Sequence, residues 1–260
     1  MMSNSIAVAS GKGGVGKTTV AVNLALTLSQ MGSKVSLMDA DFGLANAHIL
    51  LGINPKKTIR DVLKNGMLVE DVIQTGPLGL KFISGGNGLI DILNIEKNSK
   101  YQLIRSLDPI ENHTDTLIVD IPAGASENSM TFASAVDRLV IVLVGEPTSF
   151  MDAYTFIKTA KLDYNLHNFS IIVNMADNDR AAKETFQKFQ NIVGKFLDAN
   201  LAYAGGILRT KKIQNAILRK LPIVLDKEAE LEKLAFQRLS KNIIKAGENR
   251  HNGIRFFSRS

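Results

Sequence analysis

The stretch GKGGVGKTT, residues 11–19, decides the fold of this chain. It follows a short apolar run at residues 6–9 and precedes a segment of helical periodicity at residues 18–31, so it matches the pattern G-x-x-x-x-G-K-[ST] between a strand and a helix. Its glycines allow backbone angles that turn consecutive N–H groups toward phosphate oxygens, and the following helix adds the positive end of its dipole. The stretch predicts a loop that binds the phosphates of a nucleotide.

Outward from this loop, short apolar runs rich in β-branched residues alternate with longer stretches of helical character. The runs predict buried strands at residues 6–9, 35–38, 80–83, 116–121, 139–144 and 169–173. Strands that alternate with helices form parallel sheets, which need helical crossovers and burial on both faces. We therefore expect an α/β fold with a mostly parallel sheet, helices on both faces and a site at the carboxyl ends of the strands.

The composition is that of an ordinary soluble protein, and the sequence contains no cysteine. Disulfides and cysteine-ligated metal or iron–sulfur sites are therefore excluded. No signal peptide precedes the loop, and the longest aliphatic run, residues 139–144, is far shorter than the roughly 20 residues of a spanning helix. We expect a cytoplasmic protein with one P-loop domain, residues 1–246, followed by a basic, flexible tail, residues 247–260.

Positive charge is concentrated near the C-terminus, where residues 203–260 hold 13 Lys and Arg against 5 Asp and Glu. Solvated helix surfaces with scattered cations are the simplest explanation, and binding of DNA through this region is the less favoured alternative. The end of the tail, IRFF at residues 254–257 with Arg259, also suits weak insertion at an anionic membrane surface. A frayed tail fits the same residues equally well.

Three acids follow predicted strands: Asp39 and Asp41 after the second, and Asp120 at the end of the run at residues 117–120. In phosphoryl transfer the protein mainly positions groups and stabilises charge, and both Mg²⁺ and the attacking water need carboxylate oxygens. Lys17 is expected to reach the β- and γ-phosphates, and the Thr18 hydroxyl to ligate Mg²⁺. The first two acids could instead cap the next helix.

The loop holds a second lysine, Lys12, five residues before Lys17. With it, KGGVGKTT resembles the deviant Walker A motif of the MinD/ParA ATPases, which implies a P-loop NTPase fold of the SIMIBI type. In that family the additional lysine crosses a dimer interface to the phosphates of the opposite subunit. The resemblance thus implies this role for Lys12 and a homodimer when ATP is bound; contact with its own nucleotide is the alternative. It also implies that Thr19 supports the α-phosphate.

Two further segments resemble the switch regions of the same family. DADFGLAN, residues 39–46, is similar to the first switch of MinD and especially of FlhG (FleN/YlxH-like) proteins. This implies that Asp41 orients the hydrolytic water and that Asp39 belongs to the metal shell. Asp120 with the following IPAG is similar to the second switch, which implies a Mg²⁺ contact for Asp120 and γ-phosphate sensing by Gly124.

Asn174 follows a predicted strand at the place where family members carry an asparagine that reads the adenine edge. The resemblance therefore implies ATP, although NMAD at residues 174–177 also resembles the guanine-binding Asn-x-x-Asp of GTPases, so GTP stays the alternative. At residues 206–210 the chain has GILRT where relatives commonly carry Pro and Asp. The implied binding residues are Gly11, Lys12, Gly13, Gly14, Val15, Gly16, Lys17, Thr18, Thr19, Gly124 and Asn174, with Lys12, Lys17 and Asp41 catalytic and Thr18, Asp39 and Asp120 at the metal.

The resemblance covers nearly the whole chain and implies a slowly hydrolysing, dimerising ATPase switch that controls the number or placement of a cellular structure. FlhG-like control of flagella is favoured, with an SRP-type GTPase or flagellar regulators as partners and with peripheral contact to the inner face of the cell membrane. MinD-like division-site control, ParA-like partition and a non-hydrolysing scaffold are the alternatives. Relatives that carry iron–sulfur clusters need cysteines and are therefore excluded. Tyrosine-kinase relatives are expected to carry a tyrosine-rich tail, which disfavours that interpretation because all four tyrosines lie at or before residue 203.

Overall fold

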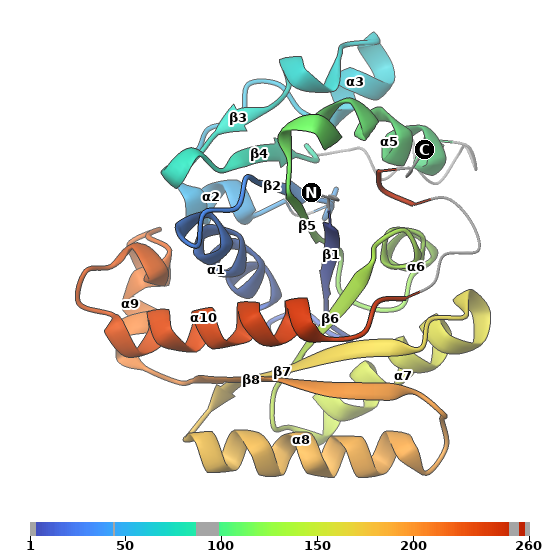
Figure 1. The fold of residues 1–260 in the computed structure, drawn as a ribbon, viewed down its shortest axis with the longest axis vertical. Helices are drawn as coiled ribbons and strands as arrows, with labels where there is room; N and C mark the ends of the chain where they lie inside the picture. Colours follow the sequence, from blue (N-terminus) through green and yellow to red (C-terminus); the bar gives the residue numbers. More distant parts are fainter. Residues whose placement is uncertain (1–3, 44, 87–98, 250–254, 258–260) are drawn as a thin grey trace.

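The computed structural model describes residues 4–43, 45–86, 99–249 and 255–257, which contain one eight-stranded sheet (Figure 1). The strand order is β3-β4-β2-β5-β1-β6-β7-β8, and every neighbouring pair is parallel except β3 and β4. The prediction of a mostly parallel sheet is confirmed. The strands are β1 (Asn4–Ala9), β2 (Val35–Asp39), β3 (Gln74–Thr75), β4 (Lys81–Ser84), β5 (Thr116–Asp120), β6 (Arg138–Leu143), β7 (Asn168–Ala176) and β8 (Asn200–Leu208).

Helices cover both faces of this sheet. Figure 1 shows α1 and α10 on one side and α6 and α7 on the other. The helices are α1 (Lys17–Gln30), α2 (Ala47–Leu51), α3 (Ile59–Asn65), α5 (Ser99–Ser106), α6 (Glu127–Ser134), α7 (Pro147–Tyr164), α8 (Asp179–Gly194), α9 (Lys211–Leu218) and α10 (Glu230–Lys245), with short 3-10 turns η1 (Val69–Asp71), η2 (Pro77–Gly79), η3 (Asp108–His113) and η4 (Ile223–Leu225).

Alternation along each strand divides the core into two layers. In β1, Ile6 and Val8 join the layer beneath α1 and α10, whereas Ala7 and Ala9 join the layer beneath α6 and α7. Successive side chains of a strand point to opposite faces, so an uninterrupted apolar run fills both layers at once. The predicted strands are mainly apolar for this reason, and all of them form within a few residues of the expected bounds.

The edge strand β8 was not predicted, because its sequence NLAYAGGIL contains adjacent glycines. A Cβ atom at Gly205 would lie 2.8 Å from Leu239 of α10, and one at Gly206 would lie 2.5 Å from Ala182 of α8. Two helices thus approach this strand from opposite faces so closely that a side chain at either glycine would clash with them. The glycines mark close packing here.

The C-terminal tail differs from the expected flexible segment in the residues that the structure describes. Phe256 and Phe257 are each only 2% exposed, and Phe256 stacks on Phe132 of α6 with ring centroids 6.4 Å apart. The Phe256 N–H donates to Ala135 O at 2.9 Å, and Asn249 N–H donates to Asp137 O at 2.8 Å. The two aromatic rings are part of the core. Ile254 and Arg259, which complete the predicted membrane-binding segment, lie outside the described residues.

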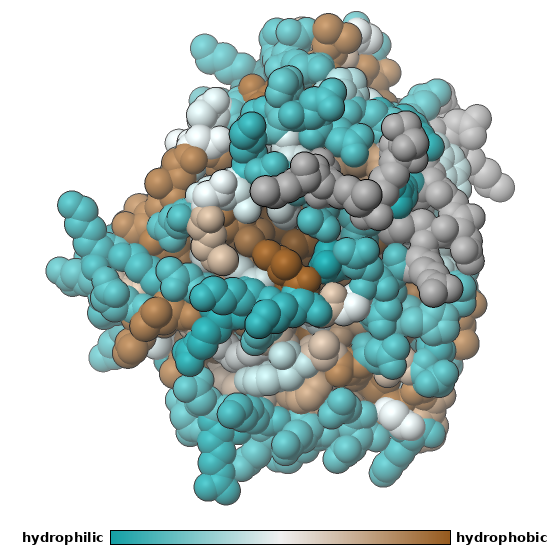
Figure 2. All heavy atoms as spheres, viewed as in Figure 1, coloured by the Kyte–Doolittle hydropathy of each residue, from teal (hydrophilic) through white to brown (hydrophobic). Residues whose placement is uncertain are grey.

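The C-terminal cations lie mostly on solvated surfaces, as expected. Lys211, Lys212, Arg219, Arg238 and Lys241 are all exposed. On the face that carries α10, side chains are mainly hydrophilic, with hydrophobic ones near α9 and the beginning of α10 (Figure 2). No helix within the described ranges is long and apolar enough to cross a membrane.

Candidate functional site

The glycine-rich loop lies at the carboxyl end of β1 and leads directly into α1. Gly14 and Gly16 adopt φ angles of 80° and 85°, and Gly16 caps the helix in a left-handed conformation. Glycine adopts such φ angles without steric strain, whereas residues with a side chain do not. A Cβ atom at Gly11 would lie 2.1 Å from the backbone carbon of Asp152 in α7, whereas one at Gly13 would meet nothing within 4 Å. The loop is therefore shaped both by its own backbone and by α7.

Segments at the carboxyl ends of β5 and β7 contact the loop from two sides. The Gly124 N–H donates to Ser10 O at 2.8 Å, which ties the segment after β5 to the start of the loop. On the other side, Asn174 Nδ2 donates to Val15 O at 2.8 Å. A Cβ atom at Gly16 would lie 2.4 Å from this nitrogen, so Gly16 makes the contact sterically feasible.

A buried ion pair lies under the loop, between Lys17 Nζ and Asp120 Oδ1. Lys17 is 7% exposed and Asp120 is fully buried. Burial raises the pKa of Asp120, and the Lys17 ammonium opposes that shift. Lys17 Nζ also lies 3.4 Å from Thr18 Oγ1. The lysine and threonine predicted at the phosphates and the metal are thus brought to the acid that ends β5.

Asp39 and Asp120 are register partners at the ends of adjacent parallel strands, β2 and β5. Burial and the nearby Asp120 charge raise the pKa of Asp39 to about 7. Asp39 Oδ1 accepts from Asp41 N–H at 3.1 Å and Oδ2 accepts from Ala47 N–H at 3.0 Å. Asp39 therefore also shapes the segment that carries Asp41, whose charge is close enough to act on Asp120.

These groups fit a magnesium-bound polyphosphate. Two buried carboxylates lie beside a hydroxyl, the ligand types that Mg²⁺ prefers. Asp120 Oδ2 is buried and has no hydrogen-bond partner among the described residues, which is costly unless a cation or donor approaches it. Glycine-rich backbone, a helix N-terminus and Lys17 supply the complementary surface for phosphate oxygens.

Lys12 points away from this ion pair and contacts the start of α7. Its Nζ lies 2.9 Å from Glu146 Oε2 and 2.9 Å from Thr148 Oγ1. Hydrogen bonding to Lys12 lowers the pKa of Glu146. The sequence analysis missed Glu146 and Thr148, although their position directly after an apolar strand is where functional residues of such sheets gather.

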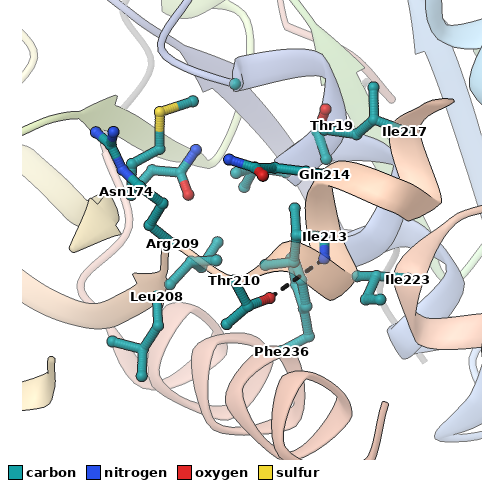
Figure 3. A pocket seen from close by; sticks show the side chains of 14 residues that line it. Thr19, Asn174, Leu208, Arg209, Thr210, Ile213, Gln214, Ile217, Ile223 and Phe236 are labelled. Carbon is teal, nitrogen blue, oxygen red and sulfur yellow. Dashed lines mark hydrogen bonds between the residues drawn. The ribbon is translucent and has the colours of Figure 1, made fainter. Parts of the chain in front are cut away.

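A cavity adjoins the far end of the loop, where Thr19 and Asn174 lie on its lining (Figure 3). β7 continues past the predicted end, through an irregular register between Val173 and Ala176. Within this irregularity Met175 has a φ of 55°, an uncommon angle for a residue with a side chain. The irregular end of β7 carries Asn174 onto the loop, so all the predicted site residues lie in one region.

Comparison with known proteins identifies the family of this chain. A profile of the ParA family, described as NUBPL iron-transfer P-loop NTPase, matches residues 1–244. Iron–sulfur clusters are held by cysteine thiolates, and the sequence has none, so the match extends to the P-loop NTPase part of that description.

Curated relatives include two flagellar proteins. Antiactivator FleN of Pseudomonas aeruginosa is 34% identical over 238 residues, which cover 92% of this chain and 85% of FleN. Flagellum site-determining protein YlxH of Helicobacter pylori is 30% identical over 222 residues, which cover 83% of this chain and 75% of YlxH.

Solved structures with the same fold include cell-division ATPases. MinD of Pyrococcus furiosus has a TM-score of 0.76 and 25% identity, covering 94% of this chain and 99% of MinD. MinD of Aquifex aeolicus in its complex with MinC has a TM-score of 0.75 and 25% identity, covering 98% and 100%. MinD of Pyrococcus horikoshii with Mg-ADP has a TM-score of 0.76 and 24% identity, covering 94% and 97%. Together with the loop, the paired acids and the sheet order, these matches place the chain in the ParA/MinD family of P-loop ATPases.

Proposed function

We propose that this chain is an ATP-driven, dimerising switch that controls the number or placement of flagella. The observation that carries the proposal is the buried pair of Lys17 and Asp120 beneath a glycine-rich loop, with Lys12 at the rim. Control of flagella is supported by the likeness to FleN and YlxH, which extends over most of the chain.

Nucleotide binding involves an exchange of cations at Asp120. Lys17 would bind the β- and γ-phosphates instead of Asp120, and Thr18 and Asp120 would hold a Mg²⁺ ion. The metal supplies positive charge that neutralises the phosphate oxygens during transfer. A buried carboxylate that lost its partner without replacement would be strongly destabilised, so metal and phosphates bind together. The bound nucleotide is ATP, and Asp39 completes the metal shell.

Hydrolysis depends on Asp41, which follows the fixed Asp39 by two residues. Asp41 accepts a hydrogen bond from the attacking water and orients it toward the γ-phosphate. Gly124 follows β5, the neighbour of β2, and its N–H donates to Ser10 O, which ties this segment to the loop. A γ-phosphate that contacts both segments couples nucleotide state to the protein surface around them.

Dimerisation depends on Lys12. In the single chain its ammonium group is satisfied by Glu146 and Thr148, and both Lys12 and Glu146 are at least partly exposed. An exposed ion pair contributes little to stability, so it is easily replaced. In the dimer Lys12 releases these partners and binds the phosphates held by the opposite subunit. An SRP-type GTPase or a flagellar regulator then binds the ATP-bound dimer.

Mass measurement in solution tests the switch. We expect a monomer with ADP, a transient dimer with ATP and a persistent dimer when Asp41→Ala is combined with ATP, because the variant binds but does not hydrolyse the nucleotide. Adding Lys12→Ala to Asp41→Ala should return the protein to monomer while ATP affinity changes little. A molecular mass that is the same with ADP and with ATP in every variant would refute the proposed switch.

Flagellar control is tested by deleting the gene in its own organism. We expect an abnormal number or position of flagella by electron microscopy, restored by the wild-type gene but not by Lys17→Ala, which lacks the phosphate contact. Normal flagella accompanied by minicells would instead assign the protein to division-site control.

Membrane contact through the tail requires Phe256 and Phe257 to leave the core, where both are buried. We expect ATP-loaded protein to sediment with anionic liposomes and protein lacking residues 253–260 to remain in the supernatant, because the inserted aromatic rings and nearby cations are then missing. The truncated protein must still dimerise with ATP, which controls for its fold. Equal sedimentation of the full-length and truncated proteins would show that the tail does not mediate membrane binding.

A further inference from the structure

The cavity beside the loop has the position and the character of a base-binding site. It adjoins Gly16 and Thr19, so a nucleotide whose phosphates occupy the loop places its base there. Its walls are largely apolar and include Val20, Ile213 and Phe236, which suit the faces of a flat aromatic ring. Selectivity between bases must then come from the few polar groups at its edge.

One of these groups has a fixed polarity. Asn174 is 7% exposed, and its Nδ2 donates to Val15 O at 2.8 Å. A carbonyl oxygen can only accept, so this bond orients the amide, and Oδ1 is left as the acceptor that faces the cavity (Figure 3). The base edge must therefore offer a donor at this point.

A second amide approaches from the opposite wall. Gln214 lies in the first turn of α9, and its side chain points across the cavity toward Asn174 (Figure 3). Thr210 fixes this turn, because its Oγ1 accepts from Ile213 N–H at 3.2 Å and donates to Glu232 at 3.0 Å. Among the described residues, the Gln214 amide has no hydrogen-bond partner of its own.

We infer that Gln214 is a specificity-determining residue, whose amide pairs with an adenine ring nitrogen while Asn174 Oδ1 accepts from the neighbouring 6-amino group. The inference rests on the proposed nucleotide binding. Adenine offers a donor beside a ring acceptor on one edge, whereas guanine presents a carbonyl oxygen at the 6-position. Guanine in the same pose would place that oxygen against Asn174 Oδ1, acceptor against acceptor. Two amides, one held by Val15 O and the other without a hydrogen-bond partner among the described residues, thus select adenine.

The segment GILRT, residues 206–210, leads into α9, and within it Thr210 caps the helix that presents Gln214. A site that hydrogen-bonds a substrate group rejects analogues that leave its own polar atoms unpaired.

Titration calorimetry with ATP, GTP, 1-deaza-ATP and 7-deaza-ATP tests the inference on the full-length chain with Mg²⁺. The variant is Gln214→Leu, and the matched control is Asn215→Leu, which replaces the adjacent exposed amide on the same helix outside the cavity lining. We expect the wild type and the control to prefer ATP over GTP by tenfold or more, on the order of one lost hydrogen bond with its unpaired partner.

Gln214→Leu should weaken the affinity for ATP about fivefold, as expected for the loss of one hydrogen bond. The affinity for GTP should change less, so the preference for ATP over GTP should fall. One deaza analogue should bind the wild type as weakly as ATP binds the variant, and the variant should no longer distinguish that analogue from ATP. An unchanged preference in Gln214→Leu, or full affinity of both deaza analogues for the wild type, would overturn the inference. A wild type that binds none of the four nucleotides would instead refute the proposed function.

Discussion

The ion pair between Lys17 and Asp120 is the constraint on which the site depends. Asp120 is fully buried beside a second buried acid, Asp39, and two such charges in a poorly solvated region repel each other. A cation between these acids and the loop therefore stabilises their charged forms. Lys17 fills that place in the single chain, and a Mg²⁺ ion held by Asp120 would compensate the acids if the lysine bound the phosphates.

The sheet order explains how these groups meet. β5 lies between β2 and β1, so the acids that end β2 and β5 come directly beside the loop that follows β1. Close approaches then fix the loop from outside: α7 presses on Gly11, and Asn174 from β7 reaches past Gly16. Both contacts require the absence of a side chain. The glycines of the loop therefore serve tertiary packing as well as phosphate binding.

Much of this architecture was predictable from sequence, because buried parallel strands are continuous apolar runs and the loop motif stands between a strand and a helix. The positions of Lys17 and of the strand-end acids follow from these patterns. The partners of Lys12 were not predictable, since Glu146 and Thr148 lie at the start of α7, 134 residues or more away along the chain. The strand β8 was not predicted because Gly205 and Gly206 are unfavourable in a strand. Their role in close packing follows only from the two helices that contact them in the structure. The burial of Phe256 likewise depends on the distant Phe132, so the tail's composition alone suggested a solvent-exposed segment.

The cation exchange at Asp120 is tested most directly by comparing the affinity for ATP with Mg²⁺ and with a chelator by calorimetry. If Lys17 can leave Asp120 only when Mg²⁺ arrives, chelation should weaken ATP binding by about tenfold or more, since a buried carboxylate would otherwise lose its partner. Equal affinity under both conditions, or no affinity under either, would contradict the account.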